Sequence, residues 1–240
     1  MVGVARFELA TSRPPVIEMI ERFVEKIPSN LKKRSGSVFY SGVDAFTGNK
    51  DLYILGLNPG GSPEEQSDET VDSSIQHIMG NEANNWSAYR DQSWQGAKPG
   101  TWKMQPRVLH LLDNLNLNPG EVPSSNVIFV HSARKSNISN EVSDLIEQCS
   151  PFHSAVIEEL GPKAILFFGK TAGKHIKKKF GANTLIDEFV ETNNRRWKSQ
   201  AFINNDGVKV IVATHLSIAD WTAPDTDPSN MIRRVIARNA

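Results

Sequence analysis

Two short segments of the chain carry side chains suited to hydrolytic or binding chemistry. The first is the string Gly56-Leu57-Asn58-Pro59-Gly60-Gly61. Its glycines let the backbone approach a ligand closely, its proline stiffens the loop, and the Asn58 carboxamide offers both a donor and an acceptor to a water molecule or a base edge. Asn, Pro and Gly are also the commonest turn residues, so the spacing fits an ordinary turn equally well.

The second segment, His215-Leu216-Ser217, follows the apolar run at 208–213. A histidine at the end of a strand can donate a hydrogen bond to an oxygen that gains negative charge, which stabilises a leaving anion. A purely structural histidine is the alternative. The functional interpretation gains weight because the strands predicted below bring Asn58 to the same edge of a sheet.

Three other patterns argue against common sites. Gly169-Lys170-Thr171 resembles the end of a phosphate-binding loop, but that loop needs a glycine five residues earlier, where the chain has Ala164. Because 165–168 is predicted to be strand, a strand-to-helix turn explains 169–171 better. No G-x-G-x-x-G follows a strand and no G-x-S-x-G is present, so the sequence predicts neither a dinucleotide site nor the usual serine nucleophile.

The elements that must position these segments alternate between strands and helices. The predicted strands are 51–57, 127–130, 164–168 and 208–213, with a shorter candidate at 38–40. The predicted helices are 16–27, 105–115, 140–160 (kinked or restarted at Pro151), 171–180 and one from about residue 227, while 190–203 is expected to be a more exposed, twisted stretch. This order predicts a three-layer αβα sandwich with a central, mainly parallel four-stranded sheet. In such sheets the ligand site lies beyond the carboxyl ends of the strands.

Composition narrows the classes of protein further. The 240 residues include 27 basic and 27 acidic side chains, which argues against coating nucleic acid by charge alone but permits a local basic rim. The single cysteine, Cys149, excludes an intrachain disulfide and a cysteine-built metal cluster. No apolar run approaches the ~20 residues of a membrane span, and the N-terminus lacks the apolar h-region of a secretory signal. We therefore expect a cytoplasmic monomer without metal or cofactor, with an arm at 1–15 and a single domain at 16–240.

At this point the chain resembles the uracil-DNA glycosylase superfamily. Gly56–Gly60 is similar to the first motif of that superfamily, in the form that carries asparagine, and His215-Leu216-Ser217 is similar to the second motif, usually His-Pro-Ser. The segments 149–152 and 161–169 resemble the helix and strand between the motifs, and the likeness spans about residues 36–240. It implies a partner DNA with a damaged or mismatched base, single- or double-stranded. It also implies hydrolysis of the N-glycosidic bond of uracil or a related deaminated or mismatched base, after the nucleotide is flipped into a pocket.

The resemblance also implies roles for individual residues. Asn58 would orient the attacking water, and His215 would stabilise the O2 oxyanion of the departing base. The residues expected to line the base pocket are Gly56, Leu57, Pro59, Gly60, Gly61, Tyr89, His131 and Ser132. The residues expected to contact DNA are Arg134 and Lys170, from their predicted positions at the sheet edge, together with Leu216, Ser217 and Trp221. Ile218 and Trp221 are substitutes for Leu216 as the wedge that enters the duplex.

The chain also departs from that superfamily at several positions. Leu216 replaces the usual proline, and the strand that normally ends in a base-reading asparagine is predicted to end in His131-Ser132. Cys149 stands where iron–sulfur branches have a cysteine, but the other three ligands are absent, so a cluster is excluded. Tyr89, Trp94 or Trp102 is expected either to stack on the base or to pack in the core. The second hypothesis is therefore a protein that keeps the fold and binds a nucleobase, nucleotide or DNA without cleaving it.

Overall fold

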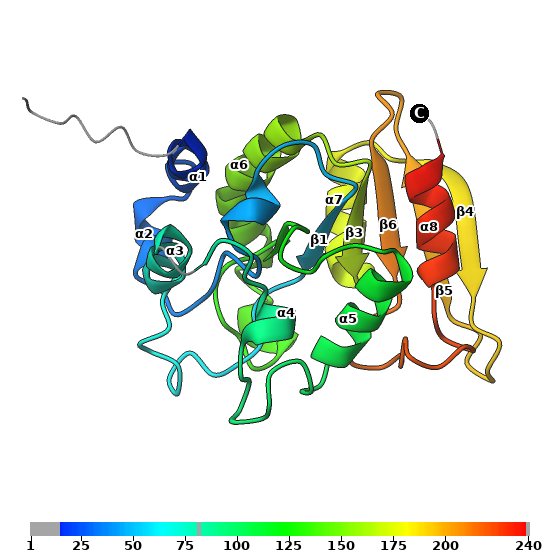
Figure 1. Ribbon diagram of the computed structural model, residues 1–240, viewed down its shortest axis with the longest axis horizontal. Helices are drawn as coiled ribbons and strands as arrows, with labels where there is room; N and C mark the ends of the chain where they lie inside the picture. Colours follow the sequence, from blue (N-terminus) through cyan, green and yellow to red (C-terminus); the bar gives the residue numbers. More distant parts are fainter. Residues whose placement is uncertain (1–14, 81–82, 239–240) are drawn as a thin grey trace, which may run out of the picture.

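The computed structural model (Figure 1) describes residues 15–80 and 83–238 and has an α/β fold built on a six-stranded mixed sheet. The strands are β1 (Leu52–Gly56), β2 (Ser124–Asn126), β3 (Ala164–Phe168), β4 (Thr184–Val190), β5 (Lys198–Ile203) and β6 (Lys209–Ala213). The helices are α1 (Pro15–Val24), α2 (Ser29–Lys32), α3 (Val71–Met79), α4 (Ala88–Asp91), α5 (Gln105–Asn114), α6 (Val142–Leu160), α7 (Lys170–Lys179) and α8 (Ser229–Ala237), with 3-10 turns η1 (Val43–Phe46) and η2 (Lys135–Ile138). Of the predicted arm 1–15, residues 1–14 lie outside the described part of the chain.

The sheet runs in the order β2-β1-β3-β6-β5-β4. The first four strands of that order are mutually parallel, whereas β5 runs antiparallel to both β6 and β4. The prediction of four strands is therefore wrong, because a β4–β5 hairpin extends the sheet. Most of the β4 side chains are only partly buried, so the hairpin lacks the continuous apolar run that identified β3 and β6.

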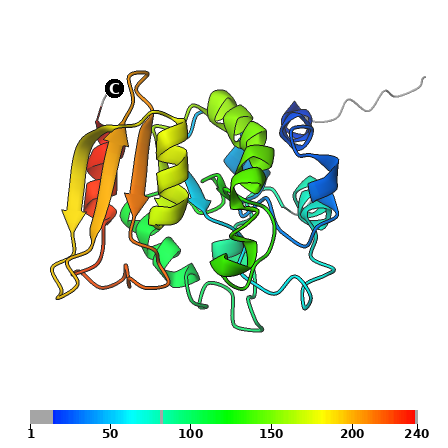
Figure 2. The same cartoon turned by 180° about the vertical axis from the view of Figure 1, so that it is seen from behind.

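Helices cover both faces of the sheet, as Figures 1 and 2 show from opposite sides. The odd-numbered residues of β1 and β3 pack with α6 and with Ile176 of α7, and the even-numbered residues pack with α5 and α8. Because successive side chains of a strand point to opposite faces, a strand that is buried on both must be apolar throughout. No helix in residues 15–80 and 83–238 combines the length and the apolar character that crossing a membrane requires.

Two predicted strands are wrong. The strand expected at 127–130 lies three residues earlier, at β2, and 127–130 instead run through the core beside α6. The expected strand at 38–40 is absent, since only isolated bridges at Ser35, Gly36 and Ser41 pair there. Both segments are apolar because they are buried, and burial alone does not require pairing in a ladder.

Pro151 does not interrupt its helix, because α6 is continuous from Val142 to Leu160. Pro151 and Glu147, whose carbonyl would have accepted a hydrogen bond from residue 151, are both on the exposed side of the helix, where water can satisfy that carbonyl. The helix ends where Gly161 takes a left-handed conformation with φ 49°. The predicted strand 164–168 and the helices α5, α7 and α8 are confirmed within one or two residues.

Candidate functional site

The topology brings both sequence motifs to one edge of the sheet. Strands β1, β3 and β6 are parallel neighbours, so the segments that leave them at Leu57, Gly169 and Thr214 emerge side by side at the carboxyl edge. Neighbouring strands lie ~4.8 Å apart, which separates the exits of β1 and β6 by roughly 10 Å. A ligand that lies across this edge can therefore contact both segments.

The Asn58 carboxamide is held in one orientation by backbone carbonyls. Its Nδ2 donates to the carbonyl of Pro59 at 2.7 Å and lies 3.5 Å from the carbonyl of Val130. Oδ1 accepts no hydrogen bond from the described residues, and the side chain is half-buried. The arrangement therefore presents an oxygen acceptor, the atom needed to hold a water molecule by one of its protons.

Asn126 is a polar residue of this edge that the sequence reasoning missed. It ends β2, is 6% exposed, and pairs in register with Gly56 of β1. A Cβ on Gly56 would lie 2.2 Å from Asn126 Oδ1, so the missing side chain of Gly56 makes room for the Asn126 carboxamide. Asn126 also interacts with Tyr40, whose pKa burial raises to about 12. The expectation that His131-Ser132 ends this strand is thus corrected, because the strand ends in asparagine.

His131 and Ser132 nevertheless lie beside the first motif. The Ser132 amide donates to the Pro59 carbonyl at 3.2 Å. The Ser35 hydroxyl donates to the Gln66 carbonyl at 2.7 Å and therefore accepts from Nδ1 of His131 at 2.9 Å. Burial lowers the pKa of His131, with Glu69 acting in the opposite direction. A neutral His131 protonated at Nδ1 has Nε2 as a hydrogen-bond acceptor.

His215 has the opposite tautomer, which follows from its contacts with Ser217. The Ser217 amide donates to Nδ1 at 3.0 Å, and the Ser217 hydroxyl lies 2.8 Å from the same nitrogen. Nδ1 is therefore an acceptor, so the neutral ring carries its proton on Nε2. Burial lowers the pKa of His215, which favours this neutral form. Ser217, predicted to touch a phosphate, uses its hydroxyl here to fix the imidazole.

Gly169 determines the position of His215 from the neighbouring strand. A Cβ added to Gly169 would lie 3.1 Å from Cδ2 and 3.2 Å from Cβ of His215. Gly169 also has φ 91°, a conformation that side chains disfavour. The glycine thus allows the imidazole to pack over the start of α7, where Lys170 is exposed.

Two predicted DNA-contacting residues are core residues instead. Leu216 and Trp221 are each 0% exposed, and the Trp221 ring packs edge-on against Phe168 with centroids 5.7 Å apart. Ile218, between them, is 52% exposed. The prediction for Leu216 and Trp221 is wrong because the loop after β6 turns both side chains into the layer of α5 and α8, which leaves Ile218 as the apolar side chain on the surface.

The remaining predicted residues divide between the surface and the core. Tyr89 is 4% exposed and packs in the core with Tyr40 and Trp94, so its ring offers no face to a base. Arg134, Lys170 and Gly60 are exposed. At Gly61, φ is 132° and a Cβ would lie 1.6 Å from Gln66 Oε1, so this glycine is required by the loop itself. Leu57 is half-buried against the α6 layer.

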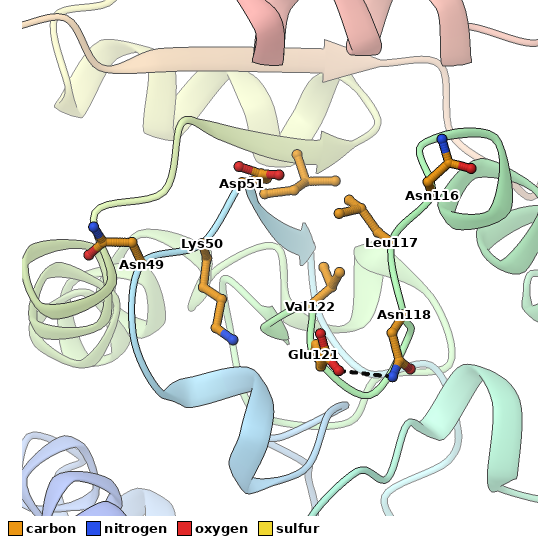
Figure 3. A pocket seen from close by; sticks show the side chains of 9 residues that line it. Asn49, Lys50, Asp51, Asn116, Leu117, Asn118, Glu121 and Val122 are labelled. Carbon is orange, nitrogen blue, oxygen red and sulfur yellow. Dashed lines mark hydrogen bonds between the residues drawn. The ribbon is translucent and has the colours of Figure 1, made fainter.

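Two cavities, of about 210 and 270 Å³, lie at the opposite edge of the sheet. Figure 3 shows the first, a polar hollow between the start of β1 and the loop after α5, in which Asn118 Nδ2 donates to Glu121 Oε1 at 3.1 Å. The second lies between Lys163, Lys209 and Arg238. Neither contains a residue of the two motifs.

Comparison of the sequence with models of known protein families finds no match, and no curated protein matches it either. Among the described residues, no group of three or more His, Cys, Asp or Glu side chains is arranged to hold a metal ion, and Cys149 is buried. The chemistry of this edge therefore has to be inferred from its own residues.

Proposed function

We propose that this protein is a DNA glycosylase that hydrolyses the N-glycosidic bond of uracil or a related deaminated or mismatched base. The observation that carries the proposal is that a neutral imidazole donor, His215, and an amide oxygen acceptor, Asn58, lie on the segments that leave the parallel strands β6 and β1 on either side of β3. The six-stranded sheet with helices on both faces is compatible with the three-layer fold of the uracil-DNA glycosylase superfamily, whose motifs the sequence resembles.

In this reaction the bond between C1′ and the base nitrogen breaks, and its electron pair leaves with the base. Negative charge spreads to the O2 oxygen of a pyrimidine, where the Nε2–H of His215 donates to it. A neutral donor suits this role because it needs no acidic pH to carry its proton, and burial lowers the pKa of His215. Water then adds hydroxide to C1′, and its other proton ends on the departing base or in solvent.

Asn58 orients that water through Oδ1 but cannot take its proton as a carboxylate would. The reaction therefore depends on the base leaving before the water attacks strongly, which predicts slow turnover. Asn126 pairs with Gly56 at the start of the loop that carries Asn58, and His131 lies beside that loop. The Asn126 carboxamide has a donor and an acceptor and His131 Nε2 is an acceptor, groups that can read the edge of a base.

A second candidate function is binding of a flipped base, nucleotide or DNA lesion without cleavage. The specific observation in its favour is that Asn58 is an amide whose donor group is already bound to the Pro59 carbonyl. With no general base supplied by Asn58, the same edge can hold a base without activating water.

Base release from oligonucleotides that contain uracil, hypoxanthine or a mismatch, single- and double-stranded, tests the proposal, with alkali cleaving the abasic product. We expect His215→Ala to lower the rate about a hundredfold or more, as loss of one oxyanion donor does, and Asn58→Ala about tenfold or more. His215→Gln keeps an N–H donor and should retain part of the activity.

Asn49→Ala and His77→Ala are matched controls, because both side chains are exposed and belong to neither motif. They should release base at the wild-type rate. Binding of the oligonucleotides without strand breaks would move the conclusion to the second function, and wild-type rates in both Asn58→Ala and His215→Ala would refute the catalytic assignment.

A further inference from the structure

The turn of the β4–β5 hairpin, residues 191–197, lies at the same edge as His215. Because β5 runs antiparallel to β6 and pairs Gln200 with Val212, the start of β5 lies level with the carboxyl end of β6. Figures 1 and 2 both show this turn beside the loop that follows β6. The hairpin is the part of the sheet that the predicted four-stranded arrangement lacks, so its turn is an addition to the site.

Hydrogen bonds fix this turn to the loop after β6. Arg195 donates from Nη1 to the Ile218 carbonyl, and its Nη2 lies 3.0 Å from Oε2 of Glu191. Glu191 is 1% exposed, so this ion pair is partly desolvated and holds the guanidinium in place. The Thr192 amide donates to the Asp225 carbonyl at 3.0 Å. Arg195 thus joins the hairpin to the segment that carries His215.

The outer surface of the turn combines a free cation with aromatic and aliphatic side chains. Trp197 is 37% exposed, and the Arg195 guanidinium lies 4.5 Å from its ring centroid. Arg195 pairs with Glu191, whereas Arg196 is exposed and forms no ion pair with any described residue. Ile218, 52% exposed, is held next to the turn by Arg195. We call Arg196, Trp197 and Ile218 the hairpin platform.

We propose that the hairpin platform binds the single-stranded segment of DNA next to the reacting nucleotide. An indole face stacks on any base, and a neighbouring arginine without an acidic partner is complementary to a backbone phosphate. Bases inside a duplex are already stacked on both faces, so a partly exposed indole favours an unpaired strand. The identity of the strand as DNA rests on the function proposed above.

Each residue of the hairpin platform has a distinct role toward the bound single strand. Trp197 stacks on a base, Arg196 contacts the phosphate beside it, and Ile218 covers the step between that base and the nucleotide at His215. Arg195 is a positioning residue that couples the hairpin to the His215 loop. This distribution also accounts for a chain of zero net charge that binds DNA, because the required charge is local.

Fluorescence anisotropy with a fluorescein-labelled thymidine oligonucleotide, single-stranded and as its duplex, measures the binding. We expect Trp197→Ala to weaken single-strand binding about tenfold or more, and Trp197→Phe to restore part of it. Arg196→Gln should lower the slope of log affinity against log salt by about 0.7, the loss of one phosphate contact. Leu185→Ala, an exposed apolar residue at the far end of β4, and Arg22→Ala, an exposed cation on α1, are matched controls that should bind as the wild type does.

Wild-type affinity in Trp197→Ala and Arg196→Gln overturns the inference, as does failure of the wild-type protein to bind the single strand. Equal losses in Leu185→Ala also overturn it, because they show a general effect of exposed apolar surface. Base release is measured on the same variants. If the wild type binds but releases no base, the glycosylase proposal fails while the platform stands; if the platform variants bind and release base normally, only the platform fails.

Discussion

Acid should destabilise this fold through one buried histidine, His153 of α6. It is 4% exposed, and its Nδ1 lies 2.8 Å from the Tyr53 hydroxyl of β1. Burial lowers the pKa of His153 from 6.5 to about 4. In the unfolded chain the pKa returns to about 6.5, so below that pH the unfolded state binds a proton that the folded state does not. The free energy of unfolding therefore falls as the pH decreases from about 6.5 to about 4 and changes no further, through this group, below that.

The size of this effect follows from the difference of about 2.5 units between the two pKa values. At about 1.36 kcal/mol per unit, His153 accounts for roughly 3 kcal/mol of stability that is lost across this window. Urea unfolding followed by tryptophan fluorescence at a series of pH values measures it. In His153→Phe the loss of unfolding free energy between neutral and acid pH should be smaller than in the wild type by about this amount.

Tyr53→Phe separates titration from the loss of the hydrogen bond. It removes the partner of His153 and should lower stability near neutral pH by about 1 kcal/mol, while most of the dependence on pH should remain, because burial is the largest cause of the lowered pKa of His153. His131 and His215, whose pKa values burial also lowers, titrate in all three proteins and cancel from the comparison. If His153→Phe loses stability in acid as steeply as the wild type, the burial argument for His153 is refuted.

Two further predictions concern the position and protonation of His215. Gly169→Ala and Gly181→Ala each place a side chain at positive φ, with values of 91° and 61° for the glycines. Gly181→Ala should cost about 1 kcal/mol in urea unfolding, and Gly169→Ala more, because its ψ of 154° puts it in a region that essentially only glycine adopts. Only Gly169→Ala meets His215, at 3.1 Å, so only that variant should lose base release, about tenfold; equal activity in the two would contradict the packing argument. Because burial lowers the pKa of His215, base release should stay constant down to about pH 6.5. At lower pH, protonation of Nδ1 removes the acceptor of the Ser217 amide that orients the ring, so base release should decline. Ser217→Ala removes a donor to neutral Nδ1, which should raise the pKa of His215 and move this decline to higher pH, and an unmoved profile would count against the assigned tautomer.

The buried centre of the fold could be predicted from sequence, and its edges could not. Strands β1, β3 and β6 are covered on both faces, so their apolar runs identify them directly. β2 is three residues long with the sequence Ser-Ser-Asn, and it belongs to the sheet because its backbone pairs with β1. No side-chain pattern identifies such a strand, whereas the apolar run that follows it, 127–130, reflects burial: outside any named strand, it makes two hydrogen bonds to the end of β1 and an isolated bridge from Val130 to Gly36.

The same distinction explains the candidate site. Asn58 and His215 could be found because each follows a predictable strand, and the exit of such a strand fixes a side chain at the edge. Asn126 was missed because the strand was predicted at 127–130, three residues after its observed position. The run Ser124-Ser125-Asn126 directly before an apolar segment is the signal that could have identified it. The orientation of Leu216, Trp221 and Ile218 depends on how one loop packs against α5 and α8, which a single sequence does not encode in its periodicity.

The carboxyl edge separates neutral polar groups from charged ones, and this separation bears on the proposed chemistry. Asn58, Asn126, His131 and His215 are half-buried or buried, and the two imidazoles have lowered pKa values, so the interior of the edge carries little charge. A carboxylate placed there would oppose the negative charge that develops on a departing base, whereas oriented neutral donors stabilise it without first being desolvated as ions. The exposed cations Arg134, Lys170 and Arg196 lie around that edge, after residues 131–132, at the start of α7 and in the β4–β5 turn. Water screens these cations from the base, but the phosphates of a bound strand can contact them. The proposed glycosylase reaction depends on such a division, because Asn58 supplies an amide and no general base, and stabilising the leaving base is the contribution that these residues can make.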